Sequence, residues 1–255
     1  MADPGIETSG SPLADIVAEA DRVLDAAEAQ GVMLRLIGGL AVHAQAQPMP
    51  AALARTYGDI DAATVKGQNR PVSDLLTGLG YEPAQQFNAL NGATRMLFHD
   101  RANDRKLDVF IDGFELNHSI PITARIDAEQ RTIPLAELLL TKLQVVEFTD
   151  KDMRDTVALL VRHEVGAGDG GTINGDVIAG LTAEDWGLWR TTELNLERLR
   201  ESVGTLGLDD ADRRLVLQRI DSLWERIEQE PKSRGWRIRA RIGDRKRWYQ
   251  VPDEV

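Results

Sequence analysis

Residues 36–61 constrain this chain more than any other stretch. An apolar run leads into the pair Gly38-Gly39, an amphipathic segment follows, and the stretch ends on two aspartates, Asp59 and Asp61. The residues around these aspartates have the apolar bias of a strand, and alternate residues of a strand share a face. We therefore expect both carboxylates to point to the same side, where they repel each other unless a cation compensates their charge.

The segment before the aspartates predicts a phosphate site. Residues 32–37 are typical of a buried strand, and a helix is expected to begin near Leu40, so Gly38 and Gly39 form the turn between them. Glycines at such a turn let the backbone approach a ligand closely, and the free N–H groups at the start of a helix favour a phosphate. Because a hard divalent cation is the commonest partner of paired carboxylates, metal-binding acids and a phosphate cradle are predicted within one short stretch.

A third acid is expected on a later strand. Residues 106–112 contain Asp108 and Asp112, which are four residues apart and would share a face of an extended strand. Asp108 lies between Leu107 and Val109 in the interior of the predicted strand. We therefore prefer Asp108 as the third metal ligand and keep Asp112 as the alternative.

This order of features resembles the DNA polymerase beta-like nucleotidyltransferase superfamily. The resemblance consists of the Gly-Gly pair, the helix, the Asp-x-Asp on the next strand and one more acid on a later strand. Residues 138–143 (LLLTKL), followed by residues 151–155 (KDMRD), are also similar to the helical Lys-Leu and Lys-Asp-x-x-Asp pattern of the AbiEii-like nucleotidyltransferase toxins. Together these matches cover residues 32–160.

The resemblance implies an enzyme, a nucleotidyltransferase that uses Mg2+ to transfer a nucleoside monophosphate from an NTP to an acceptor. The implied catalytic residues and ligands of a two-metal site, whose ions bridge the phosphates during in-line displacement, are Asp59, Asp61 and Asp108. A cation just before two metal acids can pair with a triphosphate, and a lysine on the later helix of the toxins lies near the nucleotide. The predicted nucleotide-binding residues are therefore Gly38, Gly39, Arg55, Lys142 and Asp155.

The resemblance also implies classes of acceptor and partner. Toxin-like members modify RNA such as tRNA, or protein, and imply the toxin of a toxin–antitoxin or abortive-infection system with a cognate antitoxin as its partner. Other branches modify small molecules such as aminoglycosides, and an acidic chain suits a cationic acceptor. An alternative of another class is a catalytically silent module that binds a nucleotide or RNA.

Composition excludes several other classes. The 255 residues include no cysteine, so disulfides, thiolate zinc sites and cysteine nucleophiles are excluded. No signal peptide or apolar run of membrane-spanning length is visible, so a cytoplasmic protein without membrane contact is expected. The net charge of -11 argues against a protein that coats nucleic acid with its whole surface. Residues 232–247, however, hold eight Lys or Arg against one acid, which predicts a tail that meets an anion.

The predicted fold is α/β (α+β), a small mixed sheet flanked by helices and followed by a helical C-terminal region. We expect a disordered N-terminus over residues 1–12, a nucleotidyltransferase domain over 13–165, and a helical region with a basic tail over 176–255. The glycine-rich residues 166–175 are the predicted linker. Residues 236–242 alternate basic and apolar side chains, a pattern typical of a strand.

Overall fold

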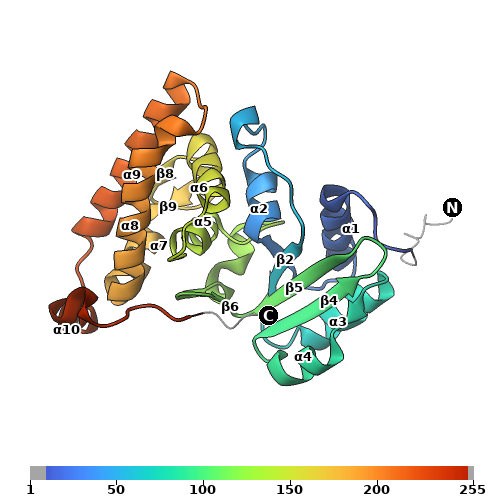
Figure 1. Cartoon of the computed structure of the whole chain (residues 1–255). Helices are drawn as coiled ribbons and strands as arrows, with labels where there is room; N and C mark the ends of the chain where they lie inside the picture. The colour runs from blue at the N-terminus through green and yellow to red at the C-terminus, as the bar shows by residue number, and fades with distance from the viewer. Residues whose placement is uncertain (1–9, 252–255) are drawn as a thin grey trace. The chain divides into compact units, whose positions relative to one another are not determined.

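The computed structural model describes residues 10–251 (Figure 1). The predicted disorder of residues 1–12 falls mostly outside this range, as do the last residues of the predicted basic tail. The chain divides into two compact units. Unit 1 comprises the described residues up to 41 with residues 56–113 and 130–132, and unit 2 comprises residues 42–55, 114–129 and those from 133 onward.

This division differs from the predicted boundary in residues 166–175. That stretch lies within unit 2, where the short strands β8 (Val165–Gly166) and β9 (Ile173–Asn174) pair in parallel at its two ends. The helices α5 (Leu135–Leu143) and α6 (Asp150–Arg162) were expected with the sheet, but they pack with helices that follow the glycine-rich stretch. The two units are interleaved along the chain, so a single flexible linker does not separate them.

Unit 1 is built on a five-stranded mixed sheet flanked by helices, which confirms the predicted fold class. The strands lie in the order β1-β2-β5-β4-β3, with β2 and β5 parallel and the other neighbours antiparallel. In chain order the elements are α1 (Ile16–Ala29), β1 (Arg35–Ile37), α2 (Gly38–Gln45, which runs on into unit 2), β2 (Ile60–Thr64), α3 (Asn69–Gly78), β3 (Glu82–Pro83), α4 (Gln85–Asn91), β4 (Arg95–Asp100) and β5 (Arg105–Ile111).

The two faces of this sheet differ in character because side chains alternate along each strand. On one face β2 and β5 present the buried aliphatic residues Ile60, Ala62, Leu107 and Val109. The helices α1 and α3 bury apolar residues of their own, namely Val23, Leu24, Leu75 and Leu76. The opposite face carries Asp61, Asp108 and Phe110. The apolar face forms the core of unit 1, and the polar face holds the carboxylates predicted to bind metal.

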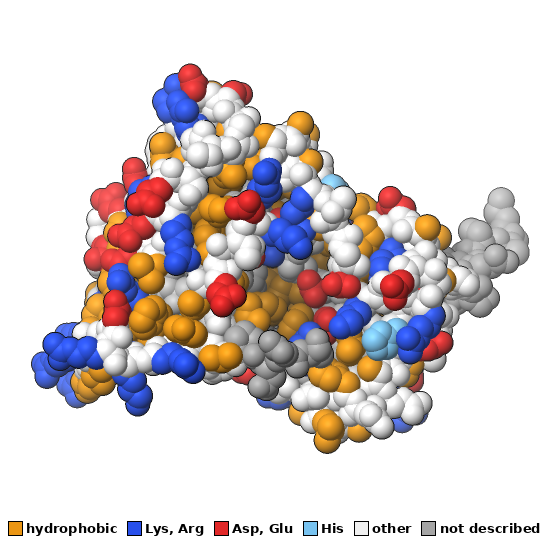
Figure 2. All heavy atoms as spheres, in the orientation of Figure 1, with side chains coloured by type: hydrophobic (Ala, Val, Ile, Leu, Met, Phe, Trp, Pro, Cys, Tyr) orange, Lys and Arg blue, Asp and Glu red, His pale blue; other side chains and the backbone are white. Residues whose placement is uncertain are grey.

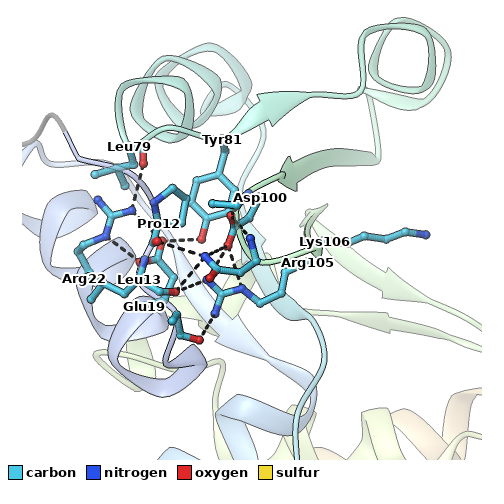
Figure 3. A network of polar contacts seen from close by, with 12 residues as sticks. Pro12, Leu13, Glu19, Arg22, Leu79, Tyr81, Asp100, Arg105 and Lys106 are labelled. Carbon is cyan, nitrogen blue, oxygen red and sulfur yellow. Dashed lines mark hydrogen bonds and ion pairs between the residues drawn. The ribbon is translucent and has the colours of Figure 1, made fainter.

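A buried ion pair ties the β4–β5 hairpin to the start of the described chain (Figure 3). Arg105 donates to Asp100 Oδ2 through Nε and Nη2 at 3.0 and 2.6 Å, and both side chains are buried. The same guanidinium donates to the carbonyl oxygens of Leu13 and Ala14. Burial by itself raises the pKa of Asp100, but the hydrogen bonds from Asn103 and Arg105 outweigh it, so this pKa lies below its ordinary value.

A second buried carboxylate, Glu19 of α1, lies in the same network (Figure 3). Its oxygens accept from Arg22 at 2.7 and 2.8 Å, from the Tyr81 hydroxyl at 2.6 Å and from the backbone N–H of Leu13 at 2.9 Å. Burial, followed by this bond to Glu19, raises the pKa of Tyr81, so the phenol stays a donor. A buried carboxylate satisfied in this way holds α1 against the residues that follow α3.

Unit 2 is mainly helical, as predicted for the C-terminal region. Besides α5, α6 and the short strands, its elements are the hairpin of β6 (Gly113–Glu115, which begins in unit 1) and β7 (Ser119–Pro121), and the helices α7 (Gly175–Glu184), α8 (Trp186–Ser202), α9 (Asp210–Gln229) and α10 (Arg234–Ile242). No helix within residues 10–251 is long and apolar enough to cross a membrane.

All five tryptophans of the chain form one packed network in unit 2. The ring of Trp189 lies 6.3 Å from Trp186, 5.8 Å from Trp224 and 5.2 Å from Trp236, between ring centroids. Trp248 packs edge-on against Trp186 at 6.1 Å. The network joins α8, α9, α10 and the residues that follow α10.

The prediction of a strand over residues 236–242 is wrong, because these residues form helix α10. Ser233 caps the helix by accepting from the N–H of Trp236 at 3.1 Å. Trp236 and Arg239 are three residues apart and so share a helix face; Trp236 packs on Trp189, and the Arg239 guanidinium lies 4.5 Å from the ring centroid of Trp186. Alternation over seven residues did not reveal this inward-facing pair.

Candidate carboxylate site and cation cluster

Asp61 and Asp108 lie side by side on the polar face of the sheet. They are register partners on the parallel strands β2 and β5, so their side chains leave the sheet on the same side. Asp108 is only 7% exposed, and Asp61 is half-buried. The structure thus brings together two of the three predicted metal ligands, although 47 residues separate them.

Gly38 lies directly against this pair. It has a φ of +71° at the junction where β1 passes into α2, a conformation that favours glycine, and α2 begins there rather than near Leu40 as predicted. A Cβ on residue 38 would overlap the carboxylate of Asp61. The glycine is therefore required twice, for the turn and for the close approach of Asp61 to the start of the helix. Gly39 follows in the first turn of α2.

Asp59 is placed differently from its predicted partner. Strand β2 begins at Ile60, so Asp59 precedes the strand and is exposed. Its Oδ1 accepts from the backbone N–H of Lys106 at 3.4 Å. The expectation that Asp59 and Asp61 belong to one strand is therefore wrong, because the regular pairing of β2 begins at Ile60, one residue after Asp59.

Arg95 of β4 neutralises Asp108. Its Nε donates to Asp108 Oδ1 at 2.7 Å, and the guanidinium also lies 5.6 Å from the ring centroid of Phe87 and 5.2 Å from that of Phe110. Arg95 was not among the residues predicted from the sequence. The signal was available, because a hairpin with its turn after Asp100 pairs Arg95 with Phe110, two residues along the same face from Asp108.

Asp112, the alternative third acid, has another role. It follows β5 with a φ of +68°, and its side chain accepts from the backbone N–H of Lys66 at 2.9 Å and pairs with the Lys66 ammonium at 2.7 Å. This pairing raises the pKa of Lys66. The register therefore favours Asp108 over Asp112 as the partner of Asp61.

The donor chemistry at Asp61 and Asp108 fits a hard divalent cation, since two carboxylates are held on neighbouring strands beside a helix start. Within residues 10–251, however, no group of three or more His, Cys, Asp or Glu side chains is arranged as a metal site. The expected set of three acids is thus not assembled, and the two-metal site remains a prediction. Arg95 supplies positive charge where such an ion would bind.

Unit 2 brings together the other three predicted residues, Arg55, Lys142 and Asp155. Arg55 donates to both carboxylate oxygens of Asp155, at 2.8 and 2.7 Å. The Lys142 ammonium of α5 lies 2.9 Å from Asp155 Oδ2. The side chain of Asp155 is 3% exposed, and those of Arg55 and Lys142 are 17% and 12% exposed. Two cations therefore share one buried carboxylate, and the cluster carries a net charge of about +1.

Helix α6 fixes the position of Asp155. Thr149 and Asp152 form a capping box at its start, and the Thr149 hydroxyl donates to Asp152 at 2.7 Å. Asp155 lies one turn further on, on the buried side of the helix. Asp152 is thus a capping residue, while Asp155 faces the two cations.

The chain was compared with known protein families, curated proteins and solved structures. No protein-family model and no curated protein matches the chain. The chain is similar to the crystal structure of an antigenic nucleotidyltransferase-like protein from Paracoccidioides brasiliensis, with a TM-score of 0.39 and 12% identity, covering 88% of this chain and 97% of that chain. A similarity of this size does not establish a shared family, so function has to be inferred from the chain's own residues.

Proposed function

We propose that the chain is a metal-dependent nucleotidyltransferase that transfers a nucleoside monophosphate from an NTP to an acceptor. The observation that carries this proposal is the in-register pairing of Asp61 and Asp108 beside Gly38 at the start of α2. Paired carboxylates provide the oxygen ligands that Mg2+ prefers, and the first N–H groups of a helix favour a phosphate.

The residues of unit 1 have separate tasks in this reaction. Asp61 and Asp108 would hold Mg2+, which when bound supplies positive charge to the phosphates. The helix start at Gly38 and Gly39 orients a phosphate, and the sheet keeps the two carboxylates in register. The chain thus contributes mainly positioning and fixed charge, which is what phosphoryl transfer requires of a protein.

The cation cluster of unit 2 supports a phosphate-bearing ligand. Arg55 and Lys142 carry two positive charges, of which Asp155 balances one. Both cations are mostly buried, so they are screened less than surface charges. The positive charge that Asp155 leaves unbalanced would attract a phosphate.

The exposed face of α10 supports RNA as the acceptor rather than a cationic small molecule. Figure 2 shows Lys and Arg side chains gathered over this helix, and its Arg234, Arg237 and Arg241 are exposed. Such a row of cations binds a phosphate backbone and repels a cationic acceptor. A toxin role belongs to the same proposal, since modifying an RNA such as tRNA would stop translation.

Nucleotide binding tests the proposal before any acceptor is known. Isothermal titration calorimetry with each of the four NTPs and Mg2+ is expected to detect binding to the wild type. Lys142→Met should weaken that binding about tenfold, because it removes one charge-assisted contact. Lys151→Met, an exposed lysine of α6, is the matched control and should bind as the wild type. Absence of Mg2+-dependent binding to any NTP would contradict the proposed function.

A further inference from the structure

Asp108 is already paired with a cation from its own chain. The bond from Arg95 Nε is 2.7 Å long, and the two side chains are 30% and 9% exposed. A charge-assisted hydrogen bond to a carboxylate this buried is strong, and it occupies Oδ1, one of the two oxygens that Asp108 offers to a metal.

Arg95 does not depend on Asp108 alone for its position. Its guanidinium lies over the rings of Phe87 on α4 and Phe110 on β5, at 5.6 and 5.2 Å from their centroids. Cation–π contacts of this kind hold a guanidinium over an aromatic face whether or not a carboxylate is bonded to it. Asp108 can therefore exchange its partner while Arg95 stays in contact with the two rings.

Helix α4 places Phe87 there through a bond to the backbone of β4. Asn88 accepts from the N–H of Leu97 at 2.7 Å and donates to its carbonyl at 3.0 Å. The aromatic pair is thus built from two elements fixed to the strand that carries Arg95. No residue of this arrangement lies within the set that is expected to bind the metal.

We propose that Arg95 is an internal counter-cation that holds Asp108 until a divalent cation displaces it from the carboxylate. This inference rests on the proposed function, because it assumes that Asp61 and Asp108 bind a metal. Arg95 is then a positioning residue: it keeps the buried carboxylate in place, and it lowers the affinity for the free ion. Binding of the ion costs the Arg95–Asp108 bond, so removing Arg95 removes that cost.

Mn2+ alone, titrated calorimetrically into the full chain, tests this competition. Arg95→Met keeps much of the side-chain length without the charge and should bind Mn2+ about tenfold more tightly than the wild type. Arg95→Lys keeps the charge and should stay close to the wild type. Adding Asp108→Asn to Arg95→Met should abolish the gain. The rise in melting temperature caused by Mn2+ should likewise be larger for Arg95→Met than for the wild type.

The outcomes separate this inference from the proposed function. Equal or weaker Mn2+ binding by Arg95→Met, with clear binding by the wild type, overturns the role of Arg95 and leaves the metal site standing. No binding of Mn2+ by any variant or by the wild type overturns both. If circular dichroism shows that Arg95→Met does not fold, Arg95→Gln, which keeps a planar polar group without the charge, is tested with the same expected gain.

Discussion

Replacing Asp61 by asparagine is expected to lower NTP turnover about 10²- to 10³-fold, because the change removes one of the two carboxylate charges that would hold Mg2+. Asparagine has the same shape, so Gly38 and the register of β2 with β5 are left intact. The measurement is the rate of pyrophosphate release, with circular dichroism to confirm folding. Asp108→Asn should have a similar effect.

Two other aspartates provide matched controls for this prediction. Asp59 precedes β2 and is exposed, so Asp59→Asn should cost much less than Asp61→Asn. Asp112 pairs with Lys66 beyond the end of β5, so Asp112→Asn should leave the rate within a factor of about two to three of the wild type. Full activity of a folded Asp61→Asn variant would contradict the mechanism.

Arg105→Met is expected to destabilise the protein by about 3–5 kcal/mol, because it leaves the carboxylate of Asp100 buried without its cation. Only 1% of Asp100 is exposed, and Arg105 also donates to the carbonyl oxygens of Leu13 and Ala14. Urea denaturation followed by far-ultraviolet circular dichroism measures the change. Tryptophan fluorescence would not serve here, since all the tryptophans lie in unit 2.

The matched control for this variant is Arg101→Met. Arg101 pairs with Glu82 at 2.9 Å, but the two side chains are 69% and 62% exposed. An exposed pair contributes at most about 1 kcal/mol, so this variant should unfold close to the wild type. Equal losses for Arg101→Met and Arg105→Met would show that the buried network does not stabilise unit 1 as described.

Alternation along strands was enough to place each of the two carboxylates on a strand. Asp61 and Asp108 are flanked by aliphatic residues at the strand period, but their in-register pairing joins two strands that are not consecutive in the chain and does not follow from that pattern. Asp59 has the same spacing, but the point at which pairing begins depends on the neighbouring strand. The sequence pattern does not contain that information, which is why Asp59 was assigned to the strand.

Contacts between distant parts of the chain were harder to predict. Arg55 and Asp155 are 100 residues apart. The position of Arg55 just before the two aspartates pointed to Arg55 and a family resemblance pointed to Asp155, but neither indicated that the two side chains bond to each other. In α10 the alternating pattern suited a strand as well as a helix. The helix is favoured by the packing of Trp236 and Arg239 against other tryptophans, a tertiary contact that local periodicity does not reveal.

The most direct test of the central claim is pyrophosphate release from each of the four NTPs with Mg2+, measured with and without total tRNA as acceptor. The proposed function predicts release by the wild type that requires Mg2+, is stimulated by tRNA and is lost in Asp61→Asn. The α10 arginines are expected to carry the tRNA dependence, which should weaken as salt is raised. Release that persists without Mg2+ or in Asp61→Asn, or no release with tRNA or a cationic small molecule as acceptor, would contradict the claim that Asp61 and Asp108 form the centre of a nucleotidyltransferase.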